Sequence, residues 1–248
     1  MNAIDDQRRI DAPSRPLLRV GAVAAIVVVV LIPLQALVFI ISPPPHTVPE
    51  YFALFERNPF LGLIDLDLLL TFDYLAMIPF YLALFLVLRR SAEGWALLAL
   101  VTGLFGLVLY LFSREGTFSM WQLSSQYAAA TAEGDRAALL GAGQTLLTLY
   151  NGGSFGISYV LGGISTLIFS AVMLRHRVVG RAPGIVGIVT GATMLVPANV
   201  GVIGTAISLL SLIPTAIWLI LLSRGLLRAA REGLPAPLDP NEGGLDGS

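Results

Sequence analysis

The chain has 248 residues, of which 56% are hydrophobic and only 12% are charged, whereas soluble domains carry about 25% charged residues. A net charge of −1 offers no basic face for phosphates, so a nucleic-acid partner is excluded. All 15 basic residues are arginine and there is no cysteine. Schiff-base lysine chemistry, disulfides and cysteine-based metal sites are therefore excluded as well. This composition predicts an integral membrane protein.

Six apolar segments are long enough to cross a bilayer, for which a helix needs about 20 residues. The first follows four arginines, as in a signal peptide, but it is longer than the usual core of about 7–15 residues and has no cleavage pattern. We therefore expect a retained helix. The segments are residues 18–42, 60–88, 93–112, 152–174, 183–199 and 203–223. They predict an all-α fold, a polytopic bundle of six transmembrane helices.

The arginines set the expected orientation, because cytoplasmic loops are enriched in basic residues. With six crossings, Arg57, Arg114 and Arg136 fall on one side and the other twelve fall on the opposite side. The sequence thus predicts a protein of the plasma (inner) membrane with both termini in the cytoplasm. The predicted divisions are a cytoplasmic N-terminal tail over 1–17, a transmembrane domain over 18–231 and a disordered cytoplasmic tail over 232–248.

The two long connections fall on the outer side. Residues 43–58 contain a proline-rich stretch followed by aromatic residues such as Tyr51 and Phe55, which indicates a short interfacial helix. Residues 113–151 carry Trp121 and aromatic and polar neighbours suited to the headgroup level. We expect an outer helix there that leads into the fourth crossing, with boundaries that the pattern leaves open.

Three acids lie in the second segment, where a charge is costly enough to indicate a functional site. A helix of about 20 residues counted outward from Arg89 leaves Asp65 and Asp67 at or above the outer boundary. A carboxylate at a helix start is favoured there by the helix dipole, so both are predicted to be solvated. Asp73 lies about 24 Å above Arg89 and hence within the bilayer. Arg114, at the outer end of the third segment, is its expected partner.

The same count places polar groups from every segment in one layer of the outer half of the bilayer. One interpretation is that they bond helices to each other, at about 0.6–2 kcal/mol each. The other is a polar pocket that is open to the outside and binds or passes a small or lipid-like molecule. The candidate pocket residues are Gln35, Asp73, Tyr110, Arg114, Ser158, Tyr159 and Asn199.

The fourth segment opens with a G-x-S-x-G match centred on Ser154. In hydrolases this motif needs a strand-turn-helix elbow, whereas here it begins a membrane helix. A base could come only from His46, because the other histidine, His176, falls on the inner side. An intramembrane serine hydrolase is therefore the weakest of the alternatives. No cofactor and no metal site are predicted, since the histidines are not paired and cysteine is absent.

Small residues at four-residue spacing predict close helix packing in the fourth and fifth segments, through Gly162 and Thr166 in one and Gly187 and Gly191 in the other. The same glycine-rich faces could serve a protein partner or a second copy of the chain. Besides a ligand-binding protein and an intramembrane hydrolase, the third functional alternative is thus a structural or accessory subunit of a membrane complex. The other expected partners are the lipid bilayer and a small or lipid-like ligand.

The stretch Asn58–Arg90, with Leu61-Gly62 followed by Asp67 and Asp73, resembles a bacterial family of multi-pass membrane proteins known as a domain of unknown function. The outer helical segment, the glycine-rich fourth segment and the sequence Gly180-Arg181-Ala182-Pro183-Gly184-Ile185 also fit, so that the resemblance spans about residues 15–230. It departs most from the family around residues 116–131. The resemblance implies a six-helix bacterial plasma-membrane protein and carries over no activity, cofactor or site residue.

Overall fold

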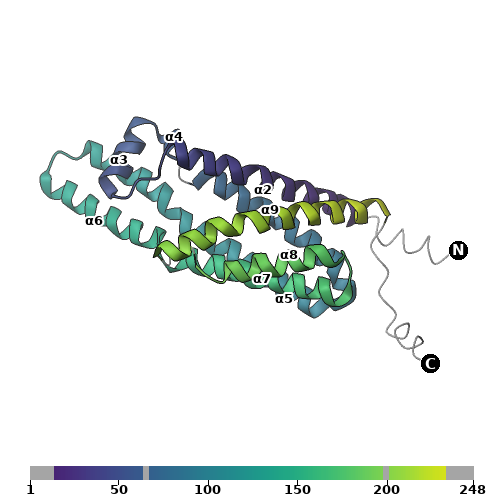
Figure 1. Ribbon diagram of the computed structural model, residues 1–248. Helices are drawn as coiled ribbons and strands as arrows, with labels where there is room; N and C mark the ends of the chain where they lie inside the picture. The colour runs from purple at the N-terminus through teal and green to yellow at the C-terminus, as the bar shows by residue number, and fades with distance from the viewer. Residues whose placement is uncertain (1–13, 64–66, 198–200, 233–248) are drawn as a thin grey trace, which may run out of the picture.

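The computed structural model describes residues 14–63, 67–197 and 201–232, and every element in these ranges is a helix (Figure 1). The helices are α2 (Arg15–Ile41), α3 (Val48–Arg57), α4 (Pro59–Leu63), α5 (Leu69–Ala129), α6 (Glu133–Tyr150), α7 (Gly153–His176), α8 (Arg181–Met194) and α9 (Gly201–Glu232). Within the described ranges, four helical stretches are long and apolar enough to cross a membrane: Arg15–Ile41, Leu69–Ala129, Glu133–His176 and Gly201–Glu232. The all-helical prediction is confirmed.

The longest helix, α5, is bent back on itself. Ala92 has φ −157° and ψ 69°, which are not helical values. Tyr74 and Tyr110 each lie 18 residues from Ala92, and their rings stack with centroids 3.4 Å apart. Residues equally far from the break thus face each other, as in an antiparallel hairpin. We call residues 69–91 the first limb of α5 and residues 93–129 the second limb.

The bundle closes where its first and last helices meet. Ser223 of α9 donates a hydrogen bond to the carbonyl oxygen of Ala22 in α2 at 2.9 Å. Leu18 and Leu226 are fully buried in the same core. The start of α2 and the end of α9 lie at one end of the molecule, and α3, α4 and α6 lie at the other (Figure 1). We call these the inner end and the outer end.

A separate small core holds the outer end together. Val48, Phe52 and Phe55 of α3 pack with Met120 of α5 and Leu147 of α6. These three elements therefore form a layer beyond the bundle of long helices. The predicted short helix after residue 43 is present as α3, and the predicted outer helix is α6 together with the end of α5.

The start of α3 is fixed by its own side chains. Thr47 is the N-cap residue, and Glu50 accepts hydrogen bonds from the backbone N–H groups of His46 and Thr47 at 2.8 and 3.1 Å. These bonds stabilise the ionised form and lower the pKa of Glu50. The reciprocal arrangement of a threonine and a glutamate three residues later is the usual capping box.

A short turn joins α7 to α8 and brings them together. Arg177 ends α7 with φ 53°, and Gly180 precedes α8 with φ 99°, a conformation that glycine adopts without steric cost. The two helices then pack closely through small residues. A Cβ added at Gly163 would lie 3.0 Å from the carbonyl oxygen of Gly191. The close contact expected of Gly191 is thus made within this chain, through Gly163 rather than the neighbouring Gly162.

The boundaries differ from the predicted segments at three places. The first limb of α5 begins at Leu69, whereas the second apolar segment was expected from residue 60. The second limb continues to Ala129 rather than ending at residue 112, because its last turns pack against α3 and α6 instead of facing solvent. α8 ends at Met194, while the predicted fifth segment reaches residue 199, beyond the described range.

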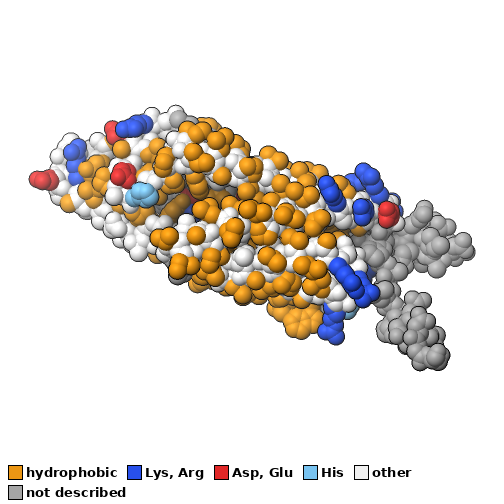
Figure 2. Space-filling view, viewed as in Figure 1, with side chains coloured by type: hydrophobic (Ala, Val, Ile, Leu, Met, Phe, Trp, Pro, Cys, Tyr) orange, Lys and Arg blue, Asp and Glu red, His pale blue; other side chains and the backbone are white. Residues whose placement is uncertain are grey.

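The surface has the pattern of a membrane protein. Figure 2 shows hydrophobic side chains over the middle of the molecule and arginines gathered at the inner end. Large apolar side chains are exposed on several helices, among them Val23 (59%), Val108 (60%), Ile185 (56%) and Leu210 (63%). Exposed apolar surface of this extent is unusual for a soluble monomer and is expected in lipid.

Candidate binding site

A buried ion pair near the outer end joins Asp67, two residues before α5, to Arg114 in the second limb of α5. Nη1 of Arg114 lies 2.8 Å from Oδ1 of Asp67, and the two side chains are 7% and 4% exposed. The hydroxyl groups of Thr117 and Tyr150 also donate to the Asp67 carboxylate, the second at 3.0 Å. Nη2 of Arg114 donates to the Tyr150 carbonyl oxygen at 3.2 Å. We call these four residues the outer ionic cluster.

Aromatic rings surround the guanidinium group of Arg114. Its Cζ atom lies 3.9 Å from the centroid of the Tyr150 ring, 5.0 Å from that of Phe155 and 5.1 Å from that of Tyr110. Cation–π contacts of this kind are strongest where water is excluded. Tyr110 in turn stacks on Tyr74, so a continuous stack runs from the ionic cluster into the bundle.

Two predictions about the acids are wrong. Asp67 is 3% exposed rather than solvated, and it, not Asp73, pairs with Arg114. The reason is the outer layer: α3 and α6 cover the helix ends, so the protein extends beyond the length counted from Arg89. The long side chain of Arg114 reaches into this layer, where the Tyr150 carbonyl oxygen accepts from the guanidinium group and two hydroxyl groups donate to the carboxylate.

A cavity of about 260 Å³ lies beneath the cluster, in the middle of the bundle. Both limbs of α5 line it, together with α2, α7, α8 and α9. Its walls are largely apolar, with Leu70, Met77 and Leu107 from α5 and Met194 from α8. We call it the central cavity.

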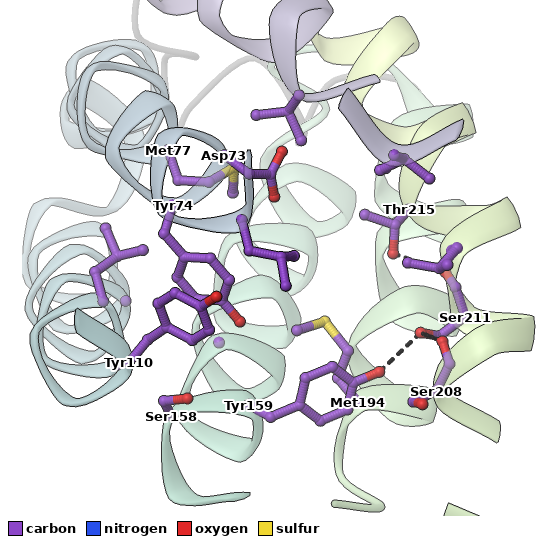
Figure 3. Close-up of a pocket in the computed structure, with 18 of the residues that line it drawn as sticks. Asp73, Tyr74, Met77, Tyr110, Ser158, Tyr159, Met194, Ser208, Ser211 and Thr215 are labelled. Atoms are coloured by element: carbon purple, nitrogen blue, oxygen red, sulfur yellow. Dashed lines mark hydrogen bonds between the residues drawn. The ribbon is translucent and has the colours of Figure 1, made fainter. Parts of the chain in front are cut away.

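Polar groups enter this apolar space from several helices. Figure 3 shows Asp73, Tyr74 and Tyr110 on one side of the central cavity, with Tyr159 and Ser211 bonded to each other on the other side. The bond joins the Tyr159 and Ser211 hydroxyl groups at 2.8 Å. In contrast, Oδ1 of Asp73 and the hydroxyl of Tyr110 are buried and have no hydrogen-bond partner among the described residues.

Two further cavities adjoin the central one. The side cavity, of about 160 Å³, lies between α2, α5 and α9 and is lined by Gln35 and Asp73. Gln35 is 7% exposed, and neither its amide oxygen nor its amide nitrogen has a partner in the described part of the chain. The outer cavity, of about 410 Å³, is lined by Arg114 and His46. Leu70 lines all three cavities and so marks where they meet.

Some serines act only in helix packing. Ser165 of α7 donates to the Ala99 carbonyl oxygen of α5 at 2.7 Å, and Ser223 makes the bond to α2 described above. These bonds cross between helices and leave no polar atom free. The unpartnered groups of Gln35, Asp73 and Tyr110 differ, since they face cavities.

The structure brings most of the expected pocket residues into one region. Asp73, Tyr110, Ser158 and Tyr159 line the central cavity, Gln35 lines the side cavity and Arg114 lines the outer cavity. Asn199 and Asp65 lie outside the described residues. Among the described residues, no hydrogen bond joins Ser154 to His46, and Ser154 does not line the outer cavity with that histidine.

The sequence did not single out Thr117, Tyr150 or Tyr74. The first two belong to a connection whose helices could not be delimited, so their distance from Asp67 could not be judged. A signal was present for Tyr74: once a turn is placed at Ala92, Tyr74 and Tyr110 are equally far from it. Locating the turn from Ser91-Ala92-Glu93-Gly94 would have paired the two rings.

Comparisons with known proteins identify the family. Residues 20–229 match the model of the family described as domain of unknown function (DUF4386). No curated protein matches the chain, and no solved structure matches it. The matched range agrees closely with the resemblance inferred from the sequence over residues 15–230. The chain belongs to this DUF4386 family.

Proposed function

We propose that the protein crosses the plasma membrane six times, through α2, the two limbs of α5, α7, α8 and α9, with both termini in the cytoplasm. The hairpin at Ala92 supports counting α5 as two crossings. The short α8 rises only about 21 Å, so the bilayer is thinned beside it. Arginines at the inner end agree with the rule that basic residues stay inside.

This topology predicts the result of a reporter experiment. A reporter fused after Arg231 is expected to be active in the cytoplasm, and an epitope inserted in the turn 130–132 is expected to be labelled on intact cells. An epitope in the turn 178–179 serves as the internal control and should be labelled only after permeabilisation. Labelling of the C-terminal fusion on intact cells would contradict the six crossings.

We further propose that the protein binds, and could pass, a small or lipid-like molecule in the central and side cavities. The observation that carries this proposal is the group of unpartnered polar atoms on Gln35, Asp73 and Tyr110, which face a largely apolar space. A buried polar group without a partner costs about 1–3 kcal/mol. A ligand that supplies the missing hydrogen bonds would recover that free energy.

An opening towards the bilayer supports a lipid-like occupant. α2 and α9 bond to each other in their inner halves, whereas the side cavity separates Gln35 from Leu209 further out. Leu209 lines both the central and the side cavity and is 61% exposed. Figure 2 shows the surface hollowed between α2 and α9. A molecule with an apolar body can enter by this route from the membrane.

Filling the junction of the cavities tests the proposal. Leu70→Trp places a large ring where the three cavities meet, while Phe72→Trp, at a side chain that is 54% exposed, changes only the outer face of the same helix. Each protein is purified in mild detergent and extracted, and the retained small molecules are identified by mass spectrometry. A compound is expected with the wild type and with Phe72→Trp, at about one per chain, and at least tenfold less with Leu70→Trp.

Identical extracts from all three proteins would contradict binding in the cavities. In that case, a protein that co-purifies in fixed ratio would favour the accessory-subunit alternative.

A further inference from the structure

Near the cavities, Arg114 has a counter-ion, whereas Asp73 has none among the described residues. Arg114 is neutralised by Asp67 within the outer ionic cluster, with two hydroxyl groups and a carbonyl oxygen completing the contacts. Among the described residues that line the central and side cavities, Asp73 alone is an acid, and none is arginine or histidine. The space below the cluster therefore has an acid and no counter-ion within the described part of the chain.

The polar atoms near Asp73 are suited to a ligand group that donates hydrogen bonds. In the side cavity the Asp73 carboxylate is joined by the amide of Gln35, whose oxygen is a further free acceptor. Tyr74, Tyr81 and Phe155 contribute ring surface to the adjoining central cavity. Rings and carboxylates both attract a cation when water is excluded.

The remaining walls are suited to an apolar body. Leucine, isoleucine and methionine side chains make up much of the lining, and the cavity opens towards lipid beside Leu209. A small hydrophilic cation would lose its hydration there without recovering enough contacts. An anion would meet no arginine or histidine among the described lining residues to neutralise it.

We infer that the ligand is an amphiphilic amine: an ammonium group that donates to Asp73 and Gln35, on an apolar body that fills the central cavity. This inference rests on the proposed binding function and names its ligand class. Either an aminolipid or a free hydrophobic amine has this chemistry.

Three compounds with the same apolar cage separate charge from shape: 1-adamantylamine, 1-adamantanol and 1-adamantanecarboxylate. Binding is measured by calorimetry on the full chain in nanodiscs of phosphatidylcholine, with empty nanodiscs as the blank. The amine is expected to bind at least tenfold more tightly than the alcohol or the carboxylate. Asp73→Asn should remove this preference, whereas Glu56→Gln, at an exposed acid of α3, should keep it.

The outcomes are distinct. If the alcohol and the amine bind equally and Leu70→Trp abolishes the binding of both, the proposed ligand class is wrong. The proposal that the cavities bind a ligand would still hold. Preference for the carboxylate, or no binding of any of the three, would overturn the ligand class as well, and the mass-spectrometric test decides separately on the cavity. Competition by octadecylamine in the bilayer would identify an aminolipid as the source, and amine binding without such competition would identify a free amine.

Discussion

Arg114→Leu is expected to lower the free energy of unfolding by about 3–5 kcal/mol, because it leaves the Asp67 carboxylate buried without its counter-ion. Asp67→Leu should cost a similar amount, since the guanidinium group then stays in an aromatic enclosure with no acid beside it. Unfolding is followed by circular dichroism during titration with sodium dodecyl sulfate. Arg57→Leu, at an exposed outer arginine, is the control and should change little.

The double variant Asp67→Leu/Arg114→Leu shows whether the two residues act as a pair. Its stability should exceed that of either single variant, because no unpaired charge remains. The same cycle with Asp73→Leu in place of Asp67→Leu should show additive effects, since no hydrogen bond or ion pair joins Asp73 to Arg114 among the described residues. Coupling with Asp73 rather than Asp67 would contradict the ionic cluster described above.

Gly187→Ala is expected to destabilise the protein by about 1–3 kcal/mol, the range found for overpacked cores. A Cβ at this position in α8 would meet Oγ of Ser170 in α7 and Nε1 of Trp218 in α9, which are both buried. Three helices would have to move apart to accept one methyl group.

Gly94→Ala is the matched control, because it also replaces a helical glycine but has no atom within 4 Å of the added Cβ. Alanine favours a helix over glycine, so this variant should be as stable as the wild type or slightly more so. Thermal unfolding in detergent compares the two. An equal loss of stability in both would show that the contact of α7, α8 and α9 does not determine the result.

Hydropathy was sufficient to predict the helices of the bundle, because length and apolar composition alone identify a membrane span. It was not sufficient for the outer end. There α3, α6 and the last turns of α5 bury Phe52, Phe55 and Leu147 against each other rather than in lipid. Their pattern is that of an ordinary water-soluble core, and it lies in a connection where the length of an apolar run does not give the helix ends.

The candidate site was predictable in part for the same reason. Counting residues from the arginines at the inner end gives the position of each residue along its helix. This position alone grouped Asp73, Tyr110, Ser158 and Tyr159, which line one cavity. Depth does not give direction around a helix. The partner of Arg114 depended on which way its side chain points, and this is decided by the tertiary fold of the outer layer.

The tight reversal at Ala92 has a consequence for biogenesis. The limbs of α5 are joined without a loop, and Asp67, which directly precedes the first limb, is neutralised by an arginine that follows it by 47 residues. During synthesis Asp67 is therefore made well before its counter-ion, and under the proposed topology we expect neither limb to enter lipid before the other is made. Under that topology the two limbs are expected to enter the membrane together, as one hairpin with the Asp67–Arg114 pair already formed.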